Sequence, residues 1–448
     1  MRNYHDIDVL LPAQKFTIDF SFSSKKPLEF MHSMILRVLR LGACGVVDLA
    51  NFLNLNQKEA TVVLNDLLAK KDIKQTENGL FELTETAKRY FQSVSDIPQI
   101  EQISYRTVKI TYDMIAFDPI LNPEYSNING LQIDANQELI SASEKNAKNT
   151  FQNNFYNYTK QDVLTFSQDH PQLYKVEKVT KERQVFNRVN LGLKINFQDK
   201  QPLVDNHIFE SSFNHLPSNP QAVFEAVKLS LTESKVDNIE SIQEELAHNP
   251  IFETFTFYDF FIQDELNLKY FGKLKGYQFY SPIYEPDNQK KFLELLERCA
   301  EEYSQDVYWL APSDHFFGKS TNFKILINQL IVSPKYNLKM FLPSRSLKSA
   351  LWDNRDLIDR SQLNGAQFFA LDEEEAFSGD FEVLVVKNKF CIVIAHVRDS
   401  NSAVLTTVPI GEFTYHFKLV NSFFEMFSHY EKHMGEHGPC YGVISISK

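Results

Sequence analysis

The chain has 448 residues, of which 43% are hydrophobic and 23% are charged. This balance indicates a folded globular protein rather than a disordered chain, and the length predicts two to four domains. Lys and Arg total 46 against 58 Asp and Glu, so the formal net charge is −12. That charge argues against a surface coated in basic residues for indiscriminate nucleic-acid binding.

The cysteines and the apolar runs favour a cytoplasmic protein. The four cysteines are scattered without a C-x-x-C pair, which fits a reducing compartment. The start of the sequence, "MRNYHDIDVLLPAQKF", has no continuous apolar core of a secretory signal. No run approaches 18 uninterrupted apolar residues, so we expect no membrane partner.

We assign residues 1–28 to an N-terminal extension and expect the first compact unit at residues 29–95. Apolar residues at helical spacing in "FMHSMILRVLRL" predict a helix that Gly42 ends. A second helix is expected in "VVDLANFLN", and Asn56 is the predicted N-cap of a third. Alternation around the Asn-Gly turn of "DIKQTENGLFELT" predicts a two-stranded hairpin, and "TETAKRYF" predicts a closing helix.

Three helices followed by a hairpin and an "LT-x-x-A" ending at Leu83, Thr84 and Ala87 resemble the winged helix-turn-helix family. The resemblance implies that the third helix enters the DNA major groove and that the hairpin, or wing, contacts phosphates. Asn and Gln can read adenine edges and Lys can neutralise phosphates. The candidate DNA-binding residues are Asn56, Gln57, Lys58, Thr61, Asn65, Lys71 and Lys74, with Lys70 and Gln75 beside them.

A structural or protein-docking role for this unit is the alternative. Its eight basic and eight acidic residues make it electrically neutral, and Glu59 and Asp66 lie on the helix that would enter the groove. The sequence leaves DNA contact and protein docking both open.

Residues 96–300 predict an α+β middle domain. "YRTVKITYDMIAF" and "RQVFNRVNLGLKINF" alternate like half-buried strands, whereas "QAVFEAVKLSL" and "SIQEELAHNP" have helical patterns. The Asn-rich stretch "PEYSNINGLQIDANQELISASEKNAKNTFQNNFYN" is expected to be a mobile excursion.

Residues 301–448 predict an α/β domain. Strands in "QDVYWLAP", "YNLKMFLP" and "GAQFFAL" alternate with helices in "STNFKILINQLIV" and "RSLKSALWDNR", and "FEVLVVKNKFCIVIA" forms a hairpin that turns at Lys387 and Asn388. This element order resembles one half of the phospholipase D-like fold, in which the hairpin carries His-x-Lys-x-x-x-x-Asp. In that family the His attacks phosphorus and the Lys holds the phosphate oxygens.

The matching positions of this chain carry different chemistry. Asp380 stands in the His place, Glu382 in the Lys place and Lys387 in the Asp place. Two carboxylates would repel a phosphodiester, so the resemblance implies a catalytically inactive domain. We therefore predict no catalytic residue and no cofactor.

Two weaker patterns carry ligand-binding interpretations. Gly318, Lys319 and Ser320 follow a strand and open a helix, as in a phosphate-binding loop, but Ser313 replaces the first glycine of that pattern. Capping by Ser320 explains the helix start, and a possible anion-binding group remains. Its members are His315, Lys319 and Ser320.

The second pattern is a C-terminal cluster of zinc-type side chains, His429, His433, His437 and Cys440. Its spacing matches no zinc family, and ordinary surface histidines are the alternative. We predict no metal site.

The sequence thus predicts a bacterial, cytoplasmic α+β multidomain protein, with a winged helix, an α+β middle and a phospholipase D-like half. The expected function is a non-enzymatic DNA-binding regulator of transcription or a nucleic-acid recognition subunit of a complex, including antiviral genome defence. Duplex DNA and a protein partner, or further copies of the chain, are the expected partners. The alternatives are a protein-interaction scaffold and a phosphodiesterase or nuclease with an unconventional site near His315 and Lys319.

Overall fold

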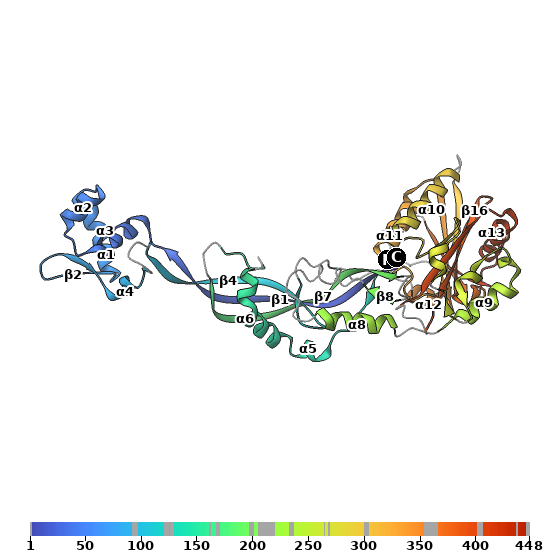
Figure 1. The fold of residues 1–448 in the computed structure, drawn as a ribbon, viewed down its shortest axis with the longest axis horizontal. Helices are drawn as coiled ribbons and strands as arrows, with labels where there is room; N and C mark the ends of the chain where they lie inside the picture. Colours follow the sequence, from blue (N-terminus) through green and yellow to red (C-terminus); the bar gives the residue numbers. More distant parts are fainter. Residues whose placement is uncertain are drawn as a thin grey trace. The chain divides into compact units, whose positions relative to one another are not determined.

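A computed structural model shows an α+β multidomain protein whose chain divides into two compact units (Figure 1). The first unit comprises residues 1–14, 111–141 and 183–448, and the second comprises residues 15–110 and 142–182. The structure describes residues 2–91, 97–120, 125, 130–160, 163–166, 171–196, 201–204, 220–232, 237–263, 265–267, 269–299, 304–353, 366–400, 406–435 and 438–444.

The second unit contains the helices and hairpin that the sequence predicts. Its elements are α1 (Phe30–Leu41), α2 (Val46–Leu53), α3 (Gln57–Ala69), β2 (Ile73–Gln75), β3 (Phe81–Leu83) and α4 (Glu85–Lys88). Gly42 ends α1, and the Asn56 side chain accepts a hydrogen bond from the Glu59 backbone as the N-cap of α3, as predicted. Ile35, Leu64 and Phe81 belong to one buried core that holds these elements together.

Long strands run through the rest of the chain's first half. They are β1 (Arg2–Pro27), β4 (Gln99–Asp113) and β7 (Gln172–Asn196). The short strands β5 (Pro119–Ile120) and β8 (Gln201–Val204) complete a sheet with the order β5-β4-β1-β7-β8. A further short strand, β6 (Leu131–Gln132), pairs with β1 in parallel. Strand β1 occupies almost all of the segment that was assigned as an N-terminal extension. Phe16, Ile18 and Phe20 are buried at the period of two that a half-buried strand requires.

Most of the described part of the Asn-rich stretch is helical, and Leu131–Gln132 within it forms β6, so the expectation of a mobile excursion was wrong there. It forms α5 (Gln137–Ser141) and α6 (Ser143–Lys160). Ala147, Phe151, Phe155 and Tyr158 fall on one buried stripe of α6, and Phe20 of β1 lies 5.0 Å from the Phe151 ring. This apolar stripe outweighs the low helix propensity of the asparagines between its members.

The first unit is built on an eight-stranded mixed sheet, ordered β11-β17-β16-β15-β12-β13-β14-β18. Strands β12, β13 and β14 are parallel, and β15 and β16 form the predicted hairpin, with Asn388 at positive φ in its turn. The strands are β11 (Gln278–Tyr280), β12 (Gln305–Leu310), β13 (Tyr336–Ser344), β14 (Gln367–Asp372), β15 (Phe381–Val386), β16 (Phe390–Val397), β17 (Val408–Thr414) and β18 (Cys440–Val443).

Apolar side chains cover both faces of this sheet, as the uninterrupted Val- and Ile-rich sequences of its central strands require. Helices α10 (Pro286–Cys299) and α11 (Thr321–Val332) pack in one core, and α9 (Ile239–His248) and α13 (Phe417–Lys432) in the other. The remaining elements are α8 (Pro220–Thr232), α12 (Leu347–Asp353), β9 (Phe261–Ile262), β10 (Glu265–Leu266) and short 3-10 turns at Pro250–Phe252, Phe257–Phe260, Tyr270–Lys273 and Phe377–Gly379.

Among the helices that the structure describes, none combines the length and the apolar content needed to cross a bilayer.

Candidate functional site

The residues expected to face DNA are all exposed, and several lie on one face of α3. Lys58, Thr61 and Asn65 follow one another at helical spacing on that face. Val62 lies among them with 68% of its surface exposed, and the sequence analysis did not select it. The seven residues predicted to bind DNA, Asn56, Gln57, Lys58, Thr61, Asn65, Lys71 and Lys74, are classed as exposed.

Some of these side chains already have partners in the chain. Asn56 and Glu59 form a reciprocal capping box, with distances of 2.8 and 3.1 Å, so Asn56 stabilises the start of α3. Lys74 Nζ lies 2.7 Å from Glu82 Oε1, and this carboxylate raises the pKa of Lys74. Within the described part of the chain, neither Lys58 nor Lys71 forms an ion pair.

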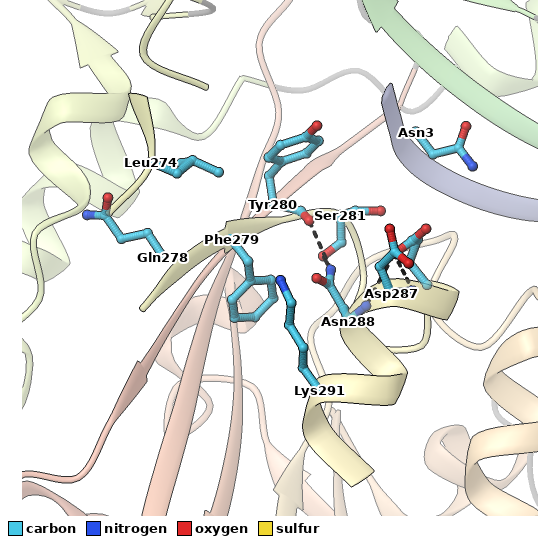
Figure 2. A pocket seen from close by; sticks show the side chains of 10 residues that line it. Asn3, Leu274, Gln278, Phe279, Tyr280, Ser281, Asp287, Asn288 and Lys291 are labelled. Carbon is cyan, nitrogen blue, oxygen red and sulfur yellow. Dashed lines mark hydrogen bonds between the residues drawn. The ribbon is translucent and has the colours of Figure 1, made fainter. Parts of the chain in front are cut away.

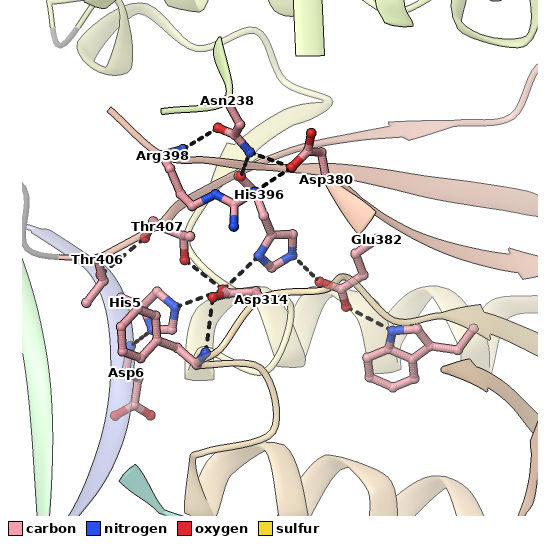
Figure 3. A network of polar contacts seen from close by, with 12 residues as sticks. His5, Asp6, Asn238, Asp314, Asp380, Glu382, His396, Arg398, Thr406 and Thr407 are labelled. Atoms are coloured by element: carbon pink, nitrogen blue, oxygen red, sulfur yellow. Dashed lines mark hydrogen bonds and ion pairs between the residues drawn. The ribbon is translucent and has the colours of Figure 1, made fainter. Parts of the chain in front are cut away.

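A buried polar network lies at the hairpin that the sequence analysis compared with the phospholipase D motif (Figure 3). His396, near the end of β16, stands between two carboxylates. Its Nε2 lies 2.8 Å from Glu382 Oε2 and its Nδ1 lies 3.2 Å from Asp314 Oδ2. The indole of Trp309 donates to Glu382 Oε1 at 2.9 Å, and the Thr407 hydroxyl donates to Asp314 Oδ2 at 2.7 Å.

This geometry makes His396 an imidazolium. Both ring nitrogens face carboxyl oxygens; when both groups are ionised they can only accept, so both nitrogens donate, and only the protonated ring has two N–H donors. Burial alone would lower the pKa of His396, but hydrogen bonds and charges from Asp314 and Glu382 outweigh it and raise the pKa to about 9. Two opposing effects also act on the pKa of Asp314. Burial raises it, but the hydrogen bonds and charges of His396 and His5 hold it well below its usual value.

A second group of polar contacts surrounds Asp380. Asn238 Nδ2 donates to Asp380 Oδ1 at 2.6 Å, Ser241 Oγ donates to Oδ2 at 3.0 Å and Arg398 donates to Oδ1 at 2.8 Å. The His396 amide also donates to the Asp380 carbonyl, at 2.8 Å. Asp380 therefore ties the hairpin to α9 rather than facing open solvent.

The network offers no evident nucleophile for phosphoryl chemistry. Glu382 is fully buried, and the His396 side chain is 4% exposed with both nitrogens engaged. A cavity of about 60 Å³ adjoins Asp314 and Thr407, which is room for a few water molecules but not for a phosphodiester substrate.

Asp380 and Glu382 were recognisable from the sequence, but their partner His396 was not identified there. His396 is a lone basic residue at the end of the apolar run "FCIVIAHV", and the turn at residues 387–388 brings it opposite Asp380. Isolated ionisable residues on two strands of one hairpin were the signal that could have found it. Asp314 had no such signal because it lies in the loop after β12, and Thr407, directly before β17, had none because it is uncharged.

The proposed anion-binding group lies at the start of α11, where the chain supplies its own carboxylates. Ser320 is fully buried; it caps the helix by accepting from the Asn322 amide at 3.1 Å and donates to Asp6 Oδ2 at 3.1 Å. Part of the His315 side chain is exposed, and desolvation of the rest of the ring, together with the charge of Lys319, lowers its pKa. The anion-binding interpretation of these residues stays a prediction.

The C-terminal histidines are only partly described. The rings of His429 and His433 stack with centroids 4.0 Å apart, and Cys440 is buried with a pKa raised by burial. His437 lies outside the described residues. Among the residues described, no group of three or more His, Cys, Asp or Glu side chains could hold a metal ion.

The sequence matches no family model, and no curated protein matches it. Similar solved structures include Nuc, a phospholipase D family member from Salmonella typhimurium, at 12% identity and a TM-score of 0.22, covering 34% of this chain and 90% of Nuc.

Two further solved structures show a comparable likeness. TrmBL2, an archaeal chromatin protein described as having a novel mode of DNA binding, matches at 15% identity and a TM-score of 0.22, over 48% of this chain and 69% of TrmBL2. Polyphosphate kinase from Porphyromonas gingivalis matches at 8% identity and a TM-score of 0.23, over 53% of this chain and 38% of the kinase. Scores this low assign no family to the chain.

Proposed function

We propose that this protein is a non-enzymatic DNA-binding recognition protein that contacts duplex DNA through α3 and the β2–β3 hairpin. The observation that carries the proposal is the exposed face of α3, on which a cation, two methyl-bearing side chains and an amide follow one another. These are Lys58, Thr61, Val62 and Asn65.

Each of these side chains has a counterpart on a base pair or on the backbone. The amide of Asn65 can pair with the N6 and N7 edge of adenine, and the methyl groups of Thr61 and Val62 can contact the methyl group of thymine. Lys58 and Lys71, which have no ion pair in the described part of the chain, are available to neutralise phosphates. The wing assignment of β2 and β3 rests on the winged helix-turn-helix resemblance of the sequence.

The residues at the β15–β16 hairpin support the non-enzymatic half of the proposal. A phosphotransfer nucleophile must present a free lone pair to substrate, and His396 as an imidazolium between Glu382 and Asp314 has none. We propose that this phospholipase D-like half serves as an inactive scaffold or recognition domain in a regulator or a defence complex.

Fluorescence anisotropy with a labelled duplex, repeated across a salt series, tests the proposal. Lys58→Ala and Lys71→Ala should each weaken binding and lower the slope of log affinity against log salt by about one. Lys88→Ala is the matched control, because Lys88 lies in the same unit but is paired with Glu85 at 2.6 Å. Binding that is equally insensitive to all three substitutions would exclude α3 and the hairpin as the DNA contact.

A protein-interaction role is the second candidate, and one observation favours it. Phe30, Leu41, Val47 and Phe52 are each more than half exposed on α1 and α2. Large exposed apolar side chains of this kind are characteristic of protein interfaces. This candidate would be favoured if the full-length protein fails to bind duplex DNA at low salt, yet forms a stable complex with another protein that Phe52→Ser abolishes.

A further inference from the structure

A polar pocket separate from the hairpin network lies beside the first turn of α10. Its volume is about 580 Å³, within the range of small-molecule sites. Figure 2 shows Asn3 of β1 and Leu274 on opposite sides of the opening, with Tyr280 and Ser281 between them. The other lining residues are Gln278, Phe279, Glu285, Asp287, Asn288 and Lys291.

Two hydrogen-bonding side-chain atoms in this pocket have no partner. Ser281 is only 2% exposed and its hydroxyl makes no hydrogen bond in the described structure. The same holds for the side-chain carbonyl oxygen of Asn3. Leaving a buried polar atom unpaired costs about 1–3 kcal/mol, so such atoms call for an explanation. A ligand with hydrogen-bond donors would satisfy both.

The backbone at Ser281 is strained, which also indicates a functional position. Its φ is +79°, a conformation that a residue with a Cβ adopts only at a cost of about 1–3 kcal/mol. Asn288 holds this turn by donating to the carbonyl oxygens of Tyr280, Ser281 and Pro282, at 3.0, 3.3 and 3.2 Å. The turn that aims Ser281 is therefore strongly fixed.

The donors of the α10 N-terminus, which would otherwise attract an anion, are already occupied. Glu285 Oε2 accepts from the amides of Asp287 and Asn288, at 3.0 and 3.3 Å. The helix start is thus capped by a carboxylate of the chain itself, which repels a second anion.

The charges around the pocket favour a cation. Glu285 and Asp287 contribute two carboxylates, whereas Lys291 contributes one ammonium and forms no ion pair with Asp287. Burial raises the pKa of Glu285, and the charge of Asp287 raises it further, so a bound cation would stabilise the ionised form of Glu285. Leu274, Phe279 and Tyr280 add apolar surface beside these charges.

We propose that this pocket binds an aliphatic amine cation, with the ammonium on Glu285 and Asp287, N–H groups on Asn3 and Ser281, and the methylene stem against Leu274 and Phe279. A free polyamine and the lysine side chain of another protein share this chemistry. The proposal is independent of DNA binding.

Isothermal titration calorimetry without DNA tests the pocket, using spermidine and a lysine-containing peptide as the two probes. Binding of spermidine but not of the peptide identifies a free polyamine site, and the reverse identifies a lysine side chain. Asp287→Asn should weaken binding of the successful probe about three- to fivefold, as expected for a partly exposed ion pair. Lys291→Met should strengthen it by a similar factor, because a like charge is removed.

Glu294→Gln is the matched control, because Glu294 is exposed on α10 but does not line the pocket. Circular dichroism verifies that each variant is folded. The proposal is overturned if neither probe binds at millimolar concentration, if phosphate binds more tightly than both, or if Lys291→Met weakens binding. Duplex affinity measured on the same variants should be unchanged, which separates this result from the fate of the DNA-binding proposal.

Discussion

The buried His396 imidazolium should make the free energy of unfolding fall as the pH becomes alkaline. Replacing Glu382 by Gln should remove most of this pH dependence. Gln keeps the shape of the side chain and can still accept the hydrogen bond from Trp309. Its amide group would then face His396 Nε2, which must accept, so the ring becomes neutral. The variant therefore tests the charge state of His396 rather than its packing.

The size of the effect follows from proton linkage. The pKa of His396 is raised from 6.5 to about 9, which corresponds to about 3 kcal/mol of stabilisation of the folded state. Because the folded pKa lies above the unfolded one, this stabilisation is complete below about pH 6.5 and is lost as the pH rises through about 9. The free energy of unfolding of the parent protein should exceed that of Glu382→Gln by about 2–3 kcal/mol at pH 6 and by less than about 1 kcal/mol at pH 9.5.

Urea denaturation followed by tryptophan fluorescence measures this difference in the first unit, because both tryptophans of the chain, Trp309 and Trp352, belong to that unit. Glu374→Gln is the matched control: it removes one exposed carboxylate from the same domain and should leave the pH dependence intact. If the free energy of unfolding of Glu382→Gln lies below that of the parent protein by the same amount at pH 6 and at pH 9.5, the imidazolium assignment is refuted.

Three other substitutions test how the elements are held. Trp309→Phe should lower the free energy of unfolding by about 1–3 kcal/mol, because one oxygen of the buried Glu382 carboxylate loses its donor; thermal unfolding followed by circular dichroism measures this. Gly379→Ala should cost about 2–4 kcal/mol in urea denaturation, since φ is +75° and the new Cβ would lie 2.2 Å from Ser313 Oγ. Asn56→Ala should cost about 1 kcal/mol as a lost N-cap, and an unchanged melting profile of the second unit would contradict the capping role.

Local signals predicted the elements well, and non-local pairing explains what was missed. Asn56 and Ser320 mark helix starts through their own side chains and Gly42 marks the end of α1, so a short window contains the information. Strand β1 is different: its partner β7 lies far along the chain, as the hydrogen bond from Thr17 to Glu182 shows. The alternation of Phe16 with Ile18 was present in the sequence but could not by itself specify a partner.

The same division applies to the buried network. The hairpin register follows from the turn at residues 387–388, so the proximity of His396 to Asp380 could have been predicted. Asp314 lies 82 residues from His396 and comes from the loop after β12, so its carboxylate could only be located in the folded chain. Without it, the sequence suggests two unpaired carboxylates, whereas the structure contains a charge-compensated network.

Charge compensation also bears on how the protein can approach DNA. The chain carries a net charge of −12, so most of its surface repels a duplex, and attraction depends on the few cations near α3. Repulsion between exposed charges fades beyond about 10 Å at 0.1 M salt, whereas each direct phosphate contact loses affinity as salt rises because counterions are released on binding. A shallow decline of affinity with salt, set by the few cations near α3, is therefore what local recognition on an acidic protein should produce, and a steep decline would indicate a basic surface that the described residues do not form.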